Sequence, residues 1–284
     1  KTLKKINKVD LKHVIDLKEK GYTVVKNLFT KQIINETGID FKKQIRELKN
    51  IQLPRDLRFK KKVKNHINLP KLDENTFMLG ERKFKNFTDS IKLKDPLINI
   101  PKIINLLCHS KIKSIASHYF GVMPYLTFVK LVKSYKNKYK DHDTQLFHID
   151  DNSVNLLKCF IYLNDVNSKN DGPLYYIKYS FKNIRNYWGK NLRWSEKRLL
   201  NIYGKENAIP ICAKKGDVIL VNTIAFHRGI KPSKKNRYCI IANYGLHPDF
   251  TYNNKFDLTS KISTKHFVNQ TRQNKKILSL LRKV

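Results

Sequence analysis

The sequence lacks an apolar run long enough to span a bilayer. The best candidate, Val218 to Phe226, is interrupted by Asn222 and Thr223 and is well short of the ~20 residues that a transmembrane helix needs. The first residues, KTLKKINKVDLKH, contain no apolar segment of the kind found in secretory signals. Because the chain does not begin with Met, the sequence leaves open what precedes Lys1. We therefore expect no membrane span.

Cysteine is also scarce. The four residues, Cys108, Cys159, Cys212 and Cys239, are far apart and form no CxxC pair. Structural zinc sites use closely spaced cysteines, and small secreted domains use a dense disulfide framework. The pattern argues against a thiolate zinc site and predicts free thiols in a reducing cytoplasm.

Arginine and acidic residues are few beside lysine. The 284 residues include 58 Lys and Arg, of which only 11 are Arg, against 23 Asp and Glu, and the formal net charge is +35. Nucleic-acid sites favour Arg and concentrate charge in patches, whereas these lysines are spread along the chain together with many Asn and Ile. Two explanations stand: the compositional bias of an AT-rich genome, or attraction to an anionic substrate, membrane or nucleic acid.

A mainly helical layer is predicted over residues 1–122. The 40% hydrophobic and 11% aromatic content suits a folded chain. Apolar residues from Leu11 to Leu17 have helical spacing, and Gly21 can end that helix. The stretch YTVVKNLF then reads as a short strand and turn, after which Thr30 can cap a second helix.

The second half of this layer is less regular. Residues 51–99 have poor periodicity and predict loops with short helices. Pro101 can open one helix that runs through KIINLLCHSKIKSIASHYF and ends at Gly121.

Residues 123–250 have the texture of strands, with a helical insert near 181–208 and a basic tail over 251–284. The strand candidates are short, rich in β-branched and aromatic residues, and separated by turn signals: YLTFVKLVKSY, LKCFIYLNDV, GPLYYIKYS, GDVILVNTIAF and RYCIIANYGL. Within the insert, a helix is expected around Ser195 to Ile202. The residues predict a single domain, 1–284, with the helical layer packed on a β-sandwich or barrel.

A histidine and a carboxylate stand two residues apart in QLFHIDDNSV. Residues i and i+2 of a strand point to the same side, so His148 and Asp150 project together, whereas Asp151 should point away. His227, just beyond a later strand, can supply a third ligand. Two His and one carboxylate are the facial ligand set of non-haem Fe(II) oxygenases. The alternative is a surface pair at a strand end and a histidine at a turn.

Arg237 begins the last strand, ten residues after His227. Its planar fork suits a bidentate pair with a carboxylate, and on a strand neighbouring His227 it can hold the distal carboxylate of 2-oxoglutarate. The alternative is an ordinary charge at a strand start.

Together, FHID, FIYLNDV, DGPLYYI, GDVILVNTIAFHRG, NRYCIIANY and the N-terminal GYTVVKNLFT resemble the phytanoyl-CoA dioxygenase-like branch of the Fe(II)/2-oxoglutarate oxygenases. The resemblance implies an α+β fold with a double-stranded β-helix (jelly-roll, cupin-like) core. It further implies His148, Asp150 and His227 as iron ligands and Arg237 as the 2-oxoglutarate clamp. The implied cofactors are Fe(II) and 2-oxoglutarate, with O2 as co-substrate.

The implied reaction is oxidative decarboxylation of 2-oxoglutarate to succinate and CO2, with hydroxylation of an unactivated C–H of a small or conjugated metabolite. Phe181 stands where many members have a histidine after the GP strand, which bears on substrate fit. Related halogenases replace the carboxylate by a small residue, so Asp150 favours hydroxylation.

Two other functions compete with this one. A non-catalytic basic β-fold module that binds nucleic acid or a membrane surface predicts strongly salt-dependent association. An oxygenase of nucleic acid would need a second arginine five residues after Arg237, where the chain has Ala242, so a nucleic-acid substrate is disfavoured.

Several other residues have two interpretations. Gln145 can approach the cofactor or form a plain hydrogen bond, and Trp188, Trp194 and Tyr187 can line a substrate cavity or pack the insert. The charges at Asp141 to Asp143 are expected to be solvated, and His109, His118 and His247 are expected in core or cap positions.

Overall fold

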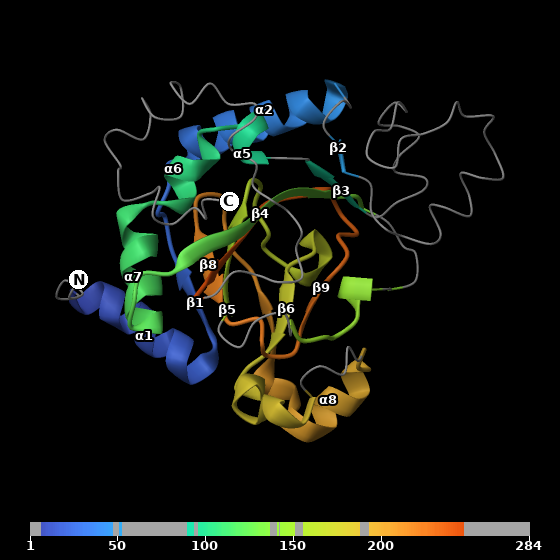
Figure 1. Ribbon diagram of the computed structural model, residues 1–284. Helices are drawn as coiled ribbons and strands as arrows, with labels where there is room; N and C mark the ends of the chain where they lie inside the picture. Colours follow the sequence, from blue (N-terminus) through green and yellow to red (C-terminus); the bar gives the residue numbers. More distant parts are fainter. Residues whose placement is uncertain are drawn as a thin grey trace.

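Two antiparallel sheets of unequal size face one another in the computed structural model (Figure 1). The structure describes residues 7–47, 51–52, 90–93, 96–136, 141, 143–150, 156–187 and 193–246. The major sheet has the order β1-β8-β5-β10-β4-β3-β2. Its strands are β1 (Tyr22–Val25), β8 (Val218–Val221), β5 (Leu156–Tyr162), β10 (Arg237–Gly245), β4 (Tyr125–Ser134), β3 (Ser90–Leu93) and β2 (Ile51–Gln52).

The minor sheet has the order β7-β6-β9, formed by β7 (Ala208–Ile211), β6 (Leu174–Ile177) and β9 (His227–Gly229). An antiparallel bridge between His148 and His227 adds a fourth extended segment beside β9. From β4 to β10 the chain therefore passes repeatedly between the two sheets. This arrangement confirms the predicted jelly-roll core, and all five predicted strands are present.

Strand alternation divides the core into two layers. On β5, Leu157, Cys159 and Ile161 face the helices, whereas Phe160 and Tyr162 pack with side chains of the minor sheet. Full burial of one large apolar side chain contributes roughly 1.5–3 kcal/mol. The near-continuous apolar character of β5 and β8 follows, because both of their faces are covered.

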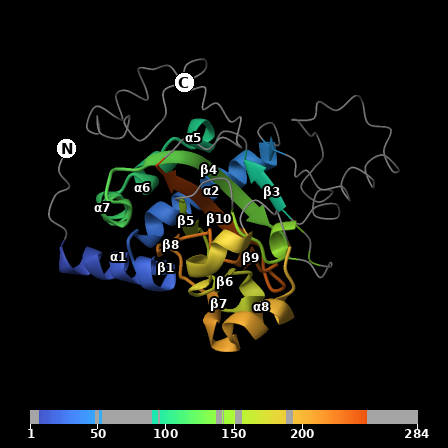
Figure 2. The same cartoon turned by 60° about the horizontal axis from the view of Figure 1, so that its bottom comes forward.

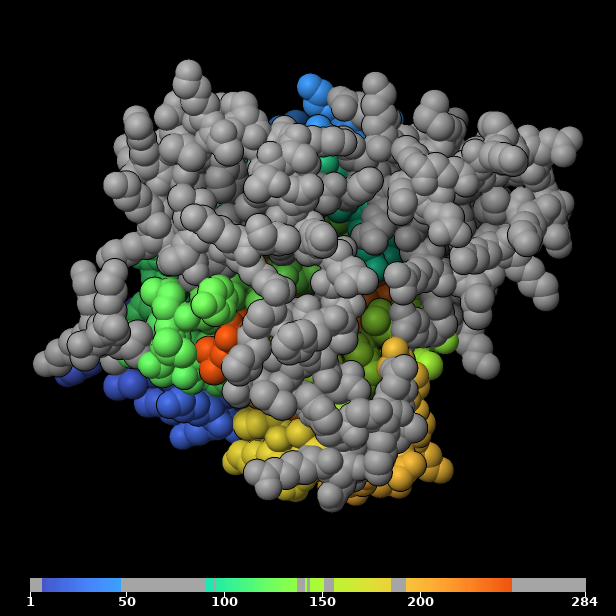
Figure 3. Space-filling view, viewed as in Figure 1, coloured from blue at the N-terminus to red at the C-terminus, as the bar shows by residue number. Residues whose placement is uncertain are grey.

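Helices cover the outer face of the major sheet (Figure 2). Helix α1 (Lys8–Lys20) ends at Gly21, which has a φ of 85°, and α2 (Lys31–Glu47) follows Thr30, whose Oγ1 accepts from the Ile33 N–H at 3.4 Å. The predicted helix, strand and helix are thus confirmed. Figure 3 shows α1 beside α7 (Ser110–Phe120) along one edge of the molecule.

The single helix predicted from Pro101 to Gly121 is wrong. The chain instead forms α6 (Ile103–Leu107) and α7, preceded by α5 (Pro96–Asn99). The break lies at His109, whose ring accepts a hydrogen bond from the Lys111 N–H at 3.2 Å and so caps α7. A side chain that satisfies a free helical N–H favours a new helix start at that point.

The prediction of loops with short helices over 51–99 is also incomplete, because β3 extends the major sheet beside β4. Residues 53–89, His247 and the tail 251–284 lie outside the described residues. The insert contains the 3-10 segment η3 (Ser180–Tyr187), α8 (Glu196–Tyr203) and η4 (Lys205–Asn207). Helix α8, capped by Ser195, confirms the helix expected around Ser195 to Ile202. Within the described part of the chain, no helix has the length and apolar character to cross a membrane.

Candidate metal centre

Three side chains converge where the two sheets meet. Atoms of His148, Asp150 and His227 that can bind a metal all lie within 4.8 Å of one another, and no other such group of three occurs among the described residues. His148 and His227 are brought together by the bridge between their backbones, and the Asp150 N–H donates to the Thr223 carbonyl at 2.9 Å. Backbone hydrogen bonds between the two segments therefore fix all three positions.

Both imidazole rings are held in one tautomer. Nδ1 of His148 lies 2.9 Å from the Leu146 carbonyl oxygen, and Nδ1 of His227 lies 2.9 Å from that of Ala225. A carbonyl oxygen only accepts, so each Nδ1 carries the proton and each Nε2 presents a free lone pair. Metal-binding histidines are typically oriented by such a bond from the second nitrogen.

The contact between His227 and Asp150 brings two acceptors together. Nε2 of His227 lies 3.5 Å from Oδ2 of Asp150. Burial, followed by the neighbouring His148, lowers the pKa of His227 to about 3, so the ring is neutral and this contact is not an ion pair. Burial likewise lowers the pKa of His148. Neutral imidazoles and a carboxylate form a donor set that fits a divalent cation.

Lys158 on β5 supplies a positive charge beside this group. Its Nζ lies 2.5 Å from Oδ2 of Asp150, and both side chains are mostly buried. Burial is the largest single influence and would raise the pKa of the Asp150 carboxyl, but the Lys158 ammonium together with His227 and His148 outweighs it and holds that pKa well below its usual range. Asp150 is therefore an anion at neutral pH.

Arg237 begins β10 and points to the same side of the major sheet as Cys239 and Ile241, toward the minor sheet. Its guanidinium donates to the Gly172 carbonyl and, at 3.0 Å, to Ser134 Oγ. Its Nε is buried without a partner, and no carboxylate of the described residues pairs with it. The expectation that Arg237 lies on the strand next to His227 is wrong, because β9 pairs with β6 while β10 lies between β5 and β4.

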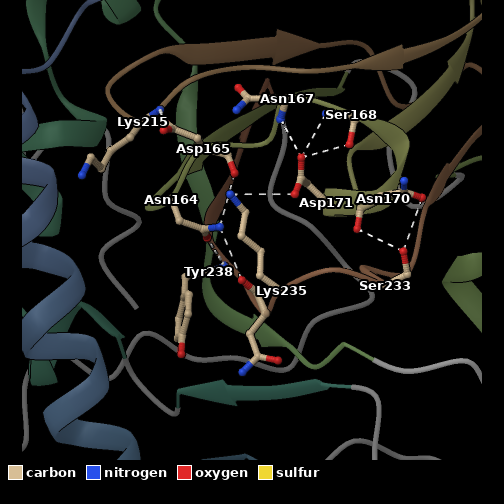
Figure 4. A network of polar contacts seen from close by, with 11 residues as sticks. Asn164, Asp165, Asn167, Ser168, Asn170, Asp171, Lys215, Ser233, Lys235 and Tyr238 are labelled. Atoms are coloured by element: carbon tan, nitrogen blue, oxygen red, sulfur yellow. Dashed lines mark hydrogen bonds and ion pairs between the residues drawn. The ribbon is translucent and has the colours of Figure 1, made fainter.

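A polar network fixes the turn that carries Gly172 (Figure 4). The Asp171 carboxylate accepts from the N–H groups of Asn167 and Ser168 and from the Ser168 hydroxyl, each at 3.1 Å. The N–H of Ser233 donates to the Asn170 carbonyl at 2.8 Å. This bracing holds the turn against the loop before β10 and so positions the carbonyl that Arg237 contacts.

Arg228 ties the segment that carries His227 to two others. Its guanidinium donates to Asp141 at 2.9 Å and to Glu196 of α8 at 2.7 Å, and it lies 5.1 Å from the centre of the Phe147 ring. The expectation that Asp141 is simply solvated is therefore wrong. Asp141, Arg228 and Glu196 form a clasp of ion pairs at β9, the strand that begins at His227.

The remaining candidates have structural positions where they are described. Trp194 is buried and packs against Phe226 with 5.2 Å between ring centres, so it packs the insert. Gln145 lies in η1 (Asp143–Gln145), and its carbonyl faces Arg228 at 3.4 Å. Trp188 and Asp151 lie outside the described residues.

Sequence reasoning missed Lys158, Arg228 and Asn243. A lone lysine inside the apolar strand LKCFIYL was a signal that could have been followed. Asn243 on β10 pairs directly with Lys158, and the local sequence around either residue does not predict that pairing.

Comparison with known proteins places these features in a family. The family model for phytanoyl-CoA dioxygenase (PhyH) matches residues 17–237. No curated protein matches the sequence.

Solved structures share the fold at low identity. SnoK, a non-heme alpha-ketoglutarate-dependent carbocyclase from nogalamycin biosynthesis, aligns with a TM-score of 0.55 and 15% identity over 86% of this chain and 85% of that chain. HygX from Streptomyces hygroscopicus, with nickel, 2-oxoglutarate and hygromycin B bound, gives 0.55 and 14% over 86% and 88%. The epimerase SnoN, in complex with Fe3+, alpha-ketoglutarate and nogalamycin RO, gives 0.56 and 15% over 84% and 83%.

Proposed function

The chain belongs to the phytanoyl-CoA dioxygenase family, and from this premise we propose that it is an Fe(II)- and 2-oxoglutarate-dependent dioxygenase. The proposed reaction hydroxylates an unactivated C–H bond of a small or conjugated metabolite. One atom of O2 enters the hydroxyl group and the other enters succinate, while the 2-oxoglutarate carboxyl group leaves as CO2. The chain would act as a single oxygenase domain.

The observation that carries this proposal is the pair of neutral imidazoles beside an ionised carboxylate. His148 and His227 each donate Nδ1–H to a carbonyl and turn Nε2 toward Asp150. Two neutral nitrogens and one carboxylate oxygen would hold iron on one face and leave other positions for ligands. Bound iron(II) would supply the centre at which O2 and 2-oxoglutarate react.

Arg237 supports the second cofactor. Its Nε–H is a buried donor without a partner, and a guanidinium can give two parallel hydrogen bonds to one carboxylate. We assign it to the distal carboxylate of 2-oxoglutarate. Hydrogen bonds to the Gly172 carbonyl and Ser134 Oγ already orient its guanidinium group.

Hydroxylation is the outcome that Asp150 favours, since a carboxylate at this position leaves less room for halide. SnoK and SnoN are named as a carbocyclase and an epimerase, so proteins of this fold direct their chemistry to different products.

Turnover of 2-oxoglutarate tests the proposal. The full chain is loaded with Fe(II) under argon and mixed with 2-oxoglutarate, and succinate is measured after air is admitted. We expect succinate from the parent protein, at least about 100-fold less from His148→Ala, and parent-like release from His118→Ala, which removes a histidine on α7. Folded parent protein that neither binds Fe(II) nor forms succinate would contradict the proposal and favour a basic binding module.

A further inference from the structure

Lys158 has an unusual place for a lysine. It lies on the face of β5 that carries Phe160 and Tyr162, between the two sheets, and its side chain is only 17% exposed. A buried ammonium is costly unless it is paired. In the described structure its partner is Asp150, one of the three residues of the metal centre.

The ammonium and a divalent metal would compete for one oxygen. Oδ2 of Asp150 lies 2.5 Å from Lys158 Nζ and 3.5 Å from His227 Nε2. Like charges a few ångströms apart in a buried site repel strongly. Lys158 therefore needs a second partner whenever Asp150 binds a metal.

Asn243 offers such a partner on the neighbouring strand. It pairs directly with Lys158 in the register of β10 and β5, so their side chains share one face, with Cβ atoms about 4.5–5.5 Å apart. Asn243 is 1% exposed, and its Oδ1 is buried without a hydrogen-bond partner. An unpaired buried acceptor is rare and points to a donor that arrives with another state or a ligand.

The same face carries a second cation. Phe128 on β4 is the other direct neighbour of Asn243, and the Lys130 ammonium lies 4.0 Å from the centre of the Phe128 ring. Lys130 is opposite Ile241, one step along the same face. Two lysines thus share this face with Asn243: Lys158 lies directly beside it, and Lys130 lies one step along β4 toward the Arg237 end of β10.

We propose that Lys158 and Asn243 form an anion-binding subsite beside the metal centre, which receives a carboxylate or phosphate group of the substrate. With metal on Asp150, Lys158 donates one N–H to Asn243 Oδ1 and has two N–H groups left for the anion. The subsite determines specificity for an acidic metabolite. This inference rests on the proposed function.

The anion could belong to the substrate or to 2-oxoglutarate, and binding measurements separate the two. The full chain is loaded with Co(II) under argon and saturated with 2-oxoglutarate. Acetate and inorganic phosphate are then titrated calorimetrically at constant ionic strength. The variants are Lys158→Met, Lys158→Gln, Lys158→Arg and Asn243→Leu, and Lys12→Met removes one exposed charge from α1 as the control.

We expect at least one probe to bind the parent protein about tenfold or more tightly than Lys158→Met and Lys158→Gln, since hydrogen bonds to a charged group carry this subsite. Lys12→Met should stay within about threefold of the parent. Lys158→Arg keeps the positive charge and should bind the probe more tightly than the two neutral variants. Asn243→Leu should weaken binding of the probe anion. If Asn243 had a purely structural role, replacing its unpaired buried amide would leave the affinity for the probe unchanged.

Equal probe affinity in the parent and both neutral Lys158 variants would overturn the subsite. A second result would also overturn it: the probe binds only when 2-oxoglutarate is absent, and Lys158→Met binds 2-oxoglutarate more weakly than the parent. Lys158 would then bind the co-substrate and not the substrate. If Co(II)-loaded parent protein fails to bind 2-oxoglutarate at all, the proposed function fails, and this result is distinct from both.

Discussion

Nε2 of His227 faces Oδ2 of Asp150 at 3.5 Å, with the proton of the imidazole held on the opposite nitrogen. Both atoms are acceptors, and the site is buried. The Lys158 ammonium pairs with Oδ2 but leaves the His227 lone pair without a donor. A divalent cation between the two atoms would serve both, whereas a proton does not serve at neutral pH because the pKa of His227 is lowered to about 3. The geometry thus favours a metal.

The same shift predicts how stability depends on pH. The folded state excludes the proton that an unfolded histidine binds below about pH 6.5, so stability is greatest above that pH and falls as the pH is lowered toward 3. For His227 the loss between pH 7 and pH 5 is about 2 kcal/mol. Urea unfolding of the metal-free protein at pH 7 and pH 5 measures the drop in the free energy of unfolding. The drop should be smaller by about this amount in His227→Gln than in the parent. An identical drop in both proteins would contradict the lowered pKa of His227.

Arg237→Ala should weaken 2-oxoglutarate binding by roughly 10- to 100-fold, because it removes hydrogen bonds to a charged group. Calorimetric titration of 2-oxoglutarate into the Co(II)-loaded protein measures the change. Affinity for Co(II) should stay the same, since the side chain contacts Gly172 and Ser134 and no residue of the metal centre. Arg46→Ala, which removes an exposed arginine of α2, is the control; equal losses in both variants would argue against a specific clamp.

Gly172→Ala should lower the free energy of unfolding by at least about 2 kcal/mol, because a left-handed φ and a close approach act together. The φ of Gly172 is +79°, and an added Cβ would lie 2.7 Å from the Pro232 nitrogen and 2.9 Å from the Ile230 oxygen. Gly121→Ala isolates the φ effect, since Gly121 has a φ of +77° with nothing within 4 Å. A similar loss in the two variants, measured by urea unfolding, would show that the close approach costs nothing.

Arg228→Ala should destabilise the protein by about 1–3 kcal/mol and also weaken metal binding. Its partners Asp141 and Glu196 are more than one-third exposed, so the ion pairs are partly screened and the stacked guanidinium accounts for part of the loss. Arg228→Lys keeps the charge without the planar fork and should recover only part of both effects. Urea unfolding and Co(II) titration measure them; unchanged metal affinity would limit the clasp to folding.

The convergence of His148, Asp150 and His227 and the jelly roll could be predicted because their signals are local. His148 and Asp150 stand two residues apart on one extended segment, and the five core strands have apolar and β-branched sequences. His227 follows one of these strands and Arg237 begins the next. The helix break at His109 was missed because one side-chain cap outweighed apolar spacing. The pairings of Lys158 with Asn243 and of Arg228 with Asp141 depend on sheet register and on contacts 85 and 87 residues apart, which periodicity does not encode.

The metal site is tested most directly by a crystal structure of the full chain soaked with Co(II) under argon, in which anomalous scattering locates the metal. We expect one strong peak bonded to Nε2 of His148, Nε2 of His227 and a carboxylate oxygen of Asp150, at roughly 2.0–2.2 Å, with Lys158 moved off Oδ2. A peak held by other side chains, or no peak in a folded protein with the three residues unchanged, would contradict this metal site.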